Sequence, residues 1–267
     1  MTIRKLSSVC AFFAMLEPVM AETIDCVIEP KAVVSVSAKD QGLISEVLVE
    51  RGQEVRIGDP VLQQVSAIES LQLELAAAVA ESDIVLRSEQ ERHIFRLIER
   101  DRVKALVDRG TNAQTALDDA EIEVRLSELA IDRAKFDLER ARIERELAAA
   151  RLARRTISAP LSGIITSVSV APGEYAGVQT ELLQIAVLNP LHVEVFVPVE
   201  FFSRVRVGDQ NMVHLVAPME GSYLATVSVV DPVFDVASGT FGLRLILPNP
   251  DHLVPAGVRC QLDLDDE

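Results

Sequence analysis

Two short segments of the chain share nearly the same pattern of hydrophobic, polar and glycine positions. Residues 36–63 align without a gap with residues 157–184. The identical positions of the first copy are Ser37, Ala38, Gly42, Ile44, Val47, Val49, Gly52, Leu62 and Gln63. The apolar spacing predicts short strands with one buried face, and the glycines mark turns. Because each copy is too short to bury a core alone, we expect the two to pack together as one small β domain.

The segment between the two copies has a helical pattern instead. From Pro60 to Pro160 it contains one glycine, Gly110, and no internal proline, which predicts two helices joined by a turn at Gly110. Ser66 with Glu69, and Thr111 with Gln114, have capping-box spacing at the two helix starts. Two arms of roughly 40 residues would form a rod about 60 Å long.

The second arm carries a heptad row that predicts an antiparallel coiled coil. The row is Leu117, Ala120, Val124, Ser127, Ile131, Ala134, Leu138, Ala141, Arg145, Ala148 and Leu152. The first arm begins with Ile68, Leu71, Leu75, Ala78, Ser82 and Val85 and becomes irregular across 87–93. The second arm has another apolar row, Ile122, Leu126, Leu129, Phe136, Ile143 and Leu147. This second row indicates either a broad seam within the hairpin or packing between hairpins of neighbouring copies.

Beyond residue 190 the pattern changes to short strands separated by turn residues. Apolar alternation over 191–198, 212–218, 223–231, 241–247 and 258–264 predicts five or six strands, with a small helical piece around Val199–Arg206. Such a series of short strands is typical of a compact β-barrel. The chain is therefore expected to be an elongated α+β protein of several domains.

The first 21 residues are expected to be a cleavable signal peptide. Arg4 and Lys5 precede a short apolar run, and Ala21 offers a small residue at the cleavage position. A short membrane anchor is the alternative, although the run is well below the ~20 residues that span a bilayer. Cys26 and Cys260 remain after cleavage, and an even pair in an oxidising compartment favours a disulfide over two unpaired buried thiols.

Composition excludes several classes of function. The formal net charge of the chain is −15, which would repel the phosphate backbone of a nucleic acid. The four histidines are scattered without metal-ligand spacing, and the chain has no nucleophile elbow, phosphate-binding loop or dinucleotide fingerprint. We therefore expect no enzymatic activity and no catalytic, cofactor or metal site.

The two copies, each with the pattern G-x-I-x-x-V-x-V-x-x-G, resemble the two halves of a lipoyl or biotinyl carrier domain. That family carries its modified lysine on the tight turn between the halves, where this chain has the helical segment instead. Lys39 lies before the first predicted strand, on the wrong side of the motif. The carrier chemistry is therefore not expected, and an acyl-carrier subunit remains only as an alternative.

A lipoyl-like domain split by a helical hairpin resembles the periplasmic adaptor subunits, or membrane fusion proteins, of the HlyD and RND-efflux type. The matching stretches are residues 41–65, 109–124, 155–176, 191–209 and 231–264. By this resemblance, a lipoyl-like barrel-sandwich hybrid comprises 36–65 and 156–187, the coiled-coil hairpin 66–155, and a small antiparallel β-barrel 188–267. Residues 22–35 would run back past the barrel.

The resemblance also implies partners and a location. The protein would lie in the periplasm, peripheral to the inner membrane, and would form a ring, commonly hexameric. It would join an inner-membrane transporter, RND-type in preference to an ABC-type or type I exporter, to a TolC-like outer-membrane channel. Arg102, Leu106, Gly110 and Thr111 are the expected tip contacts. Ala113 replaces the serine usual at that position, which leaves the identity of the channel open. A periplasmic scaffold without a pump is a further alternative.

Overall fold

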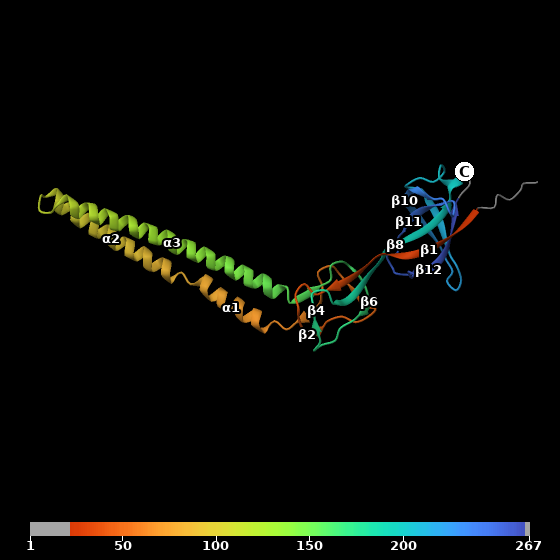
Figure 1. The fold of residues 1–267 in the computed structure, drawn as a ribbon, viewed down its shortest axis with the longest axis horizontal. Coiled ribbons are helices and arrows are strands. Elements are labelled where there is room, and N and C mark those ends of the chain that lie inside the picture. Colours follow the sequence, from red (N-terminus) through yellow and green to blue (C-terminus); the bar gives the residue numbers. More distant parts are fainter. Residues whose placement is uncertain (1–21, 265–267) are drawn as a thin grey trace, which may run out of the picture. The chain divides into compact units, whose positions relative to one another are not determined.

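The computed structural model of the chain describes residues 22–264, which fold as two compact units (Figure 1). One unit is formed by the chain up to Val34 and from Ala186 onward, and the other is Ser35–Ile185. Strands β1 (Glu22–Ser37) and β8 (Glu181–Pro198) run from one unit into the other. The expected signal peptide lies outside the described residues.

The unit containing the C-terminal strands is a small β-barrel. Its strand order is β1, β12 (Val258–Leu264), β9 (Gln210–Leu215), β10 (Ser222–Asp235), β11 (Thr240–Leu247) and β8. Along β11, buried side chains alternate with less buried ones, as the apolar alternation predicted. All six strands contribute to one buried cluster, so the sheet curls around its own core. The helical piece is shorter than expected, a 3₁₀ turn at Val199–Phe201.

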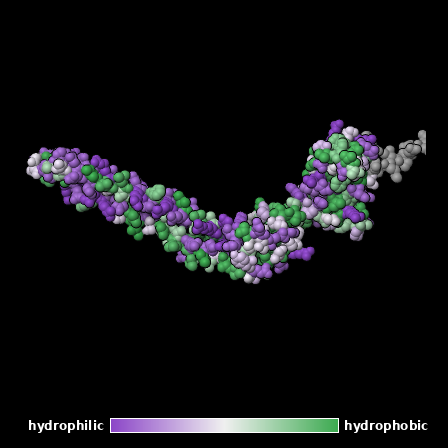
Figure 2. Space-filling view, in the orientation of Figure 1, coloured by the Kyte–Doolittle hydropathy of each residue, from purple (hydrophilic) through white to green (hydrophobic). Residues whose placement is uncertain are grey.

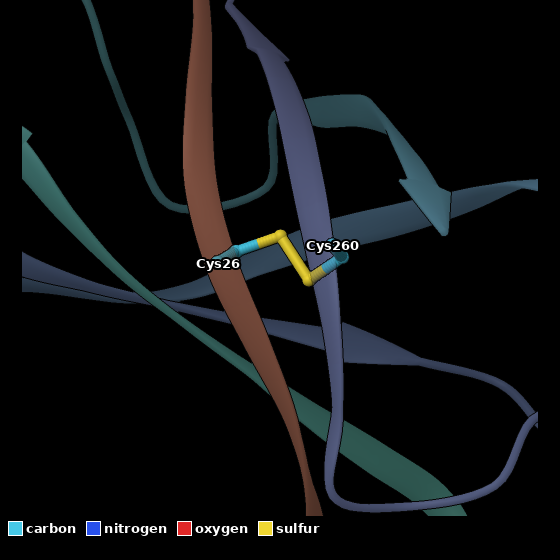
Figure 3. The surroundings of a disulfide bond; sticks show 2 residues. All are labelled: Cys26 and Cys260. Carbon is cyan, nitrogen blue, oxygen red and sulfur yellow. A yellow bond between two sulfur atoms is a disulfide. The ribbon is translucent and has the colours of Figure 1, made fainter. Parts of the chain in front are cut away.

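A disulfide joins the first and last strands of this unit. Cys26 and Cys260 stand directly opposite each other on the antiparallel strands β1 and β12, with 4.8 Å between their Cα atoms (Figure 3). Both residues are buried, at 3% and 1% exposure. The predicted bridge is therefore confirmed, and the alternative of two unpaired thiols is excluded.

In the other unit the two sequence copies form equivalent and interleaved strands. The first copy contributes β2 (Gly42–Val47), β3 (Glu54–Val55) and β4 (Pro60–Gln64). The second contributes β6 (Gly163–Val168), β7 (Tyr175–Ala176) and the start of β8, after β5 (Thr156–Ser158). Strand β2 pairs with β7 and β3 pairs with β6, so each half completes the sheet of the other.

Matching hydrogen bonds show why both copies have the same glycine. The amide of Gly52 donates to the carbonyl of Ile165, and the amide of Gly173 donates to the carbonyl of Ile44, each at 2.8 Å. The two glycines have φ angles of 88° and 90°, which L-residues rarely adopt. Ile44 and Ile165 lie at 0% and 1% exposure in one shared core. The predicted packing of the two copies is thus confirmed.

The helical hairpin consists of three helices. The first arm is divided into α1 (Ala67–Glu81) and α2 (Ile84–Asp108), and the second arm is the single helix α3 (Gln114–Ala153). At 40 residues, α3 is about 60 Å long at a rise of about 1.5 Å per residue. Both α1 and α2 pack along α3. Every member of the predicted heptad row on α3 is buried or half-buried, so this seam is confirmed.

The heptad row predicted on the first arm was wrong. Ile68, Leu71 and Leu75 are 65–69% exposed. The side chains that turn toward α3 are instead Glu69, Leu73, Ala76 and Ala80 in α1, and then Leu86, Glu89 and His93 in α2. From Ala80 to Leu86 this inner row advances by six residues rather than the seven of a heptad. The break at Ser82 and Asp83 absorbs the difference, because a continuous helix would turn the later residues away from α3.

The predicted capping boxes were also wrong. Ser66 is the N-cap of α1 but makes no side-chain cap hydrogen bond, and Glu69 binds Arg155 instead. The N-cap of α3 is Ala113 rather than Thr111. The Thr111 hydroxyl donates to the carbonyl of Leu106 at 2.9 Å and so serves the end of α2. Capping-box spacing alone does not reveal a competing partner elsewhere in the fold.

Candidate partner-docking site on the hairpin

The turn at the tip of the hairpin is held by backbone hydrogen bonds at the end of α2. Gly110 has a φ of 69°, the left-handed conformation predicted for it. Its amide donates to the carbonyl of Val107 at 2.8 Å. The amide of Thr111 donates to the carbonyl of Leu106 at 3.0 Å. These two bonds form a Schellman motif, in which glycine is favoured because it has no Cβ. The tip is therefore a defined turn.

The four tip residues expected from sequence are brought together at this end of the hairpin. Arg102 and Leu106 lie one helical turn apart on α2, which places them on the same face. Both are exposed, Leu106 at 43%, and so are Gly110, Thr111 and the neighbouring Ala113. The tip thus presents a cation, a leucine side chain and a threonine bound to the carbonyl of that leucine. Such a surface is suited to protein contact and contains no nucleophile–base pair.

The base of the hairpin is held by an arginine that the sequence analysis did not single out. Arg155, two residues after the end of α3, donates to the carboxylate of Glu69 in α1 at 2.6 Å and to the carbonyl of Gln41 at 2.9 Å. It also donates to the side chain of Gln64 at 3.3 Å. Gln64, at 1% exposure, in turn donates to the carbonyl of Asp40 at 2.9 Å. Arg155 therefore ties the two arms of the hairpin to the β strands beneath them.

This contact shifts the titration of Glu69. The side-chain hydrogen bond from Arg155 lowers the pKa of Glu69 below its ordinary value, and the charge of Arg155 acts in the same direction. Both side chains are largely covered, at 15% and 21% exposure, so water screens the pair less than it would at the surface. The neighbouring pair of Arg154 and Asp40 is about half exposed. A signal was present in the sequence, since two arginines end the helical pattern just before the second copy.

One polar position of the coiled-coil seam is explained by a partner on the other arm. Ser127 is 6% exposed, and its hydroxyl lies 2.7 Å from Nδ1 of His93 on α2. The hydroxyl also donates to the carbonyl of Val124 at 2.6 Å. The contact between Ser127 and His93 forms in only one axial alignment of the two arms, so it favours that alignment, because any other would leave the His93 ring nitrogen without this partner.

Two apolar rows on the hairpin remain uncovered within the chain. The second row of α3 is 45–67% exposed, which excludes the broad seam as its explanation. On the first arm, Ile68, Leu71, Leu75, Val79 and Val85 are 52–69% exposed. Figure 2 shows hydrophobic residues exposed among polar ones along the hairpin. These rows are unpartnered surfaces of the described chain.

Two expectations from the sequence concern metal ligands and a carrier lysine. Among residues 22–264, no group of three or more His, Cys, Asp or Glu side chains is arranged to hold a metal ion. Lys39 lies in the bend before β2, next to Asp40, which pairs with Arg154 at the base of the hairpin, and it is not on a turn between the two halves. None of the helices within that range is long and apolar enough to cross a membrane.

Comparisons with known proteins agree with this architecture. The multidrug export protein AcrE of Escherichia coli strain K12 is 29% identical over 167 residues, which cover 57% of this chain and 42% of AcrE. The chain spans about half the length of the curated relatives it matches. No family model matches the sequence.

Two solved structures are similar in fold to this chain over most of its length. MacA from Actinobacillus actinomycetemcomitans superimposes with a TM-score of 0.77 at 19% identity, covering 93% of this chain and 80% of MacA. A membrane fusion protein from Streptococcus pneumoniae has a TM-score of 0.56 at 12% identity, covering 92% of this chain and all of that structure, 100%. The chain therefore has the fold of the periplasmic adaptor, or membrane fusion, proteins, as its two half-motifs and the hairpin between them predicted.

Proposed function

We propose that this protein is a non-catalytic periplasmic adaptor that joins an inner-membrane transporter to a TolC-like outer-membrane channel for export. The observation that carries the proposal is the hairpin, which occupies the place of the carrier-lysine turn and ends in an exposed, backbone-braced tip. The lipoyl-like halves then serve as a mount for the hairpin. The name of AcrE, a multidrug export protein, agrees with an export role.

The transporter is proposed to be of the RND type. The support is the resemblance of residues 238–250 to the barrel of RND adaptors. An adaptor of an ABC-type or type I exporter is the alternative. Mild crosslinking in cells followed by identification of the copurifying membrane proteins distinguishes them, because each transporter class would be recovered as a different protein.

Arg102, Leu106, Gly110 and Thr111 are proposed to contact the channel. The test is the double variant Arg102→Glu with Leu106→Asp, which reverses the charge of the tip and makes its leucine position acidic. We expect loss of crosslinking to the channel and at least a tenfold loss of export, because both changes bury unpaired carboxylates in the contact.

Arg151→Glu is the matched control for the tip variant. It makes the same charge reversal on an exposed side chain of α3, at the opposite end of the hairpin. We expect it to keep both crosslinking and export. If the tip variant crosslinks and exports as well as this control, the tip does not dock on a channel.

The protein is further proposed to assemble as a ring, commonly of six copies in adaptors of this kind. The support is the pair of uncovered apolar rows, one on the first arm and one on α3. A pair of different surfaces on one chain suits a head-to-tail contact, which closes into a ring when the rotation permits. Native mass spectrometry of the whole chain gives the number of copies directly.

A further inference from the structure

A serine, a histidine and an aspartate are joined on the outer face of the β-barrel. Nδ1 of His214 on β9 lies 2.6 Å from the hydroxyl of Ser222 on β10, and its Nε2 lies 2.7 Å from the carboxylate of Asp263 on β12. Ser222 and His214 stand directly opposite each other in the pairing of β9 with β10. The next residues on β9 and β12, Val213 and Leu262, are fully buried, so the three polar side chains lie on the outer face.

The partners of His214 set the direction of each hydrogen bond. An ionised carboxylate only accepts, so Nε2 carries the hydrogen that binds Asp263. In the neutral ring Nδ1 then has a lone pair, and it accepts the hydrogen of the Ser222 hydroxyl. Ser222 is exposed, whereas the side chains of His214 and Asp263 are 38% and 26% exposed. The serine oxygen is therefore bound to a base and open to a reagent from solvent.

Serine hydrolases use the same three groups, in which the histidine takes the proton of the serine and the aspartate orients the ring. In this barrel the two ring nitrogens are used in the reverse order, and the proton path from serine to imidazole is the same. Ser222 and Asp263 lie 8 and 49 positions from His214 in the chain, so no local motif indicated them. The pairing of three neighbouring strands brings them together.

The backbone beside Ser222 offers a hydrogen-bond donor to an oxyanion. The amide of Leu215 donates to the carbonyl of Gly221 at 2.9 Å, which marks these two residues as a hydrogen-bonded pair. The next pair, Ser222 with His214, is then a non-hydrogen-bonded pair, and the amide of Ser222 points away from β9. On that side β10 pairs with β11 only from Thr226 onward. The register of the described strands therefore leaves this amide without a partner in either ladder.

An apolar pair lies next to the serine on the same face. Met212 and Leu224 are opposite each other, two residues along β9 and β10 from His214 and Ser222. They are 37% and 50% exposed. Because alternate residues of a strand share a face, this pair provides an apolar surface beside the serine oxygen. Such a surface suits a small acyl group better than a charged one.

We propose that Ser222 captures an acyl group from small activated esters, with His214 as the base. The serine oxygen attacks the carbonyl carbon while its proton passes to Nδ1 of His214. The bond to the leaving alcohol then breaks, and the alcohol takes that proton. The products are an ester on Ser222 and the free alcohol. Capture of one group per chain is independent of the hairpin and leaves the proposed adaptor function non-catalytic.

A fluorescent fluorophosphonate applied to the whole purified chain tests the serine. The serine oxygen displaces fluoride from phosphorus, its proton leaves through His214, and the probe stays bound. We expect the label to map to Ser222 by mass spectrometry of peptides and to be absent from Ser222→Ala. Labelling that maps elsewhere, or that persists in Ser222→Ala, overturns the proposal.

Two variants test the base. His214→Gln keeps a polar side chain but has no basic nitrogen, and we expect the labelling rate to fall at least tenfold. Asp263→Asn keeps the shape of the carboxylate, but its amide donates to Nε2, so Nδ1 carries the hydrogen and no longer accepts from the serine. We expect a loss of at least tenfold here as well. Circular dichroism at the strand band checks folding, and a folded variant that labels at the wild-type rate overturns the role of His214.

Ser228 is the matched control on the same strand. Its hydroxyl donates to the carbonyl of Arg244 at 3.0 Å, so it has a carbonyl partner in place of a base. We expect no label on Ser228 and an unchanged labelling rate in Ser228→Ala. If Ser228 labels as fast as Ser222, the reactivity is that of any exposed serine and the proposal is wrong.

The ester p-nitrophenyl acetate tests acyl capture itself. We expect one nitrophenolate to be released per chain above the background of Ser222→Ala, and one acetyl group to be retained on Ser222. If no acetyl group is retained on Ser222, or if release continues beyond one per chain, capture is overturned. Crosslinking to the channel and export are unaffected by either outcome, so the adaptor function is tested separately.

Discussion

Replacement of Arg155 by methionine tests the clamp at the base of the hairpin. Methionine keeps much of the length of the side chain but removes its charge and its three hydrogen bonds, to Glu69, Gln41 and Gln64. A hydrogen bond to a charged group contributes about 1.5–3 kcal/mol, and an unsatisfied buried acceptor costs about 1–3 kcal/mol. Allowing for the partial exposure of the pair, we expect Arg155→Met to lower the free energy of unfolding by about 2–4 kcal/mol.

Arg154→Met provides the comparison for this change. Arg154 makes one ion pair with Asp40 at 2.7 Å, and the two side chains are 50% and 41% exposed. Exposed pairs of this kind contribute about 0–1 kcal/mol, so we expect a small effect. Urea denaturation followed by circular dichroism at the helix band, with hydrogen exchange of α1, measures both variants. If the two variants unfold at the same urea concentration, Arg155 does not clamp the hairpin.

The clamp should also depend on pH. Arg155 holds the pKa of Glu69 below its ordinary value of 4.5, so the folded state binds this proton less readily than the unfolded state. The stabilisation is therefore complete above the ordinary value and is lost as pH falls through the lowered pKa. We expect the stability difference between wild type and Arg155→Met to stay constant from pH 7 to about pH 5 and to narrow below about pH 4.5. If the stability difference between wild type and Arg155→Met stays unchanged down to pH 3, the ionised carboxylate of Glu69 does not contribute to the clamp.

Two further predictions concern the tip turn and the disulfide. Gly110→Val is expected to cost about 1–2 kcal/mol more than Gly110→Asn, because a β-branched residue tolerates a φ of 69° poorly. Hydrogen exchange at the end of α2 measures this, and equal exchange in the two variants would show that the turn does not need the left-handed conformation. Replacement of Cys26 and Cys260 by alanine opens a link of sequence separation 234 and is expected to cost about 3–5 kcal/mol. The melting temperature of the variant, compared with those of oxidised and reduced wild type, measures this cost. If the variant melts at the same temperature as the oxidised wild type, the disulfide does not stabilise the fold.

Several features of this protein follow from the sequence by itself. The two copies predicted that the halves form equivalent strands and pack together, because the same short pattern of apolar residues and glycines specifies the same strands and turns wherever it occurs. The heptad row of α3 predicted the seam, because a long row of mostly apolar residues at heptad spacing leaves little choice of buried face. Gly110 predicted the tip, since it is the one residue of the helical region that adopts a left-handed conformation without strain.

The tertiary structure decided the features that depend on which partner a residue meets. The first arm has apolar residues on two sides, and its pattern alone does not show which side α3 covers. In the structure Leu73 and Ala80 pack against α3, which leaves Leu71 and Leu75 exposed. Glu69 has the spacing of a capping residue, yet Arg155, far along the chain, takes its carboxylate through a stronger charge-assisted hydrogen bond. Local patterns determine helices, strands and turns, whereas long-range contacts determine which of several competing surfaces is buried.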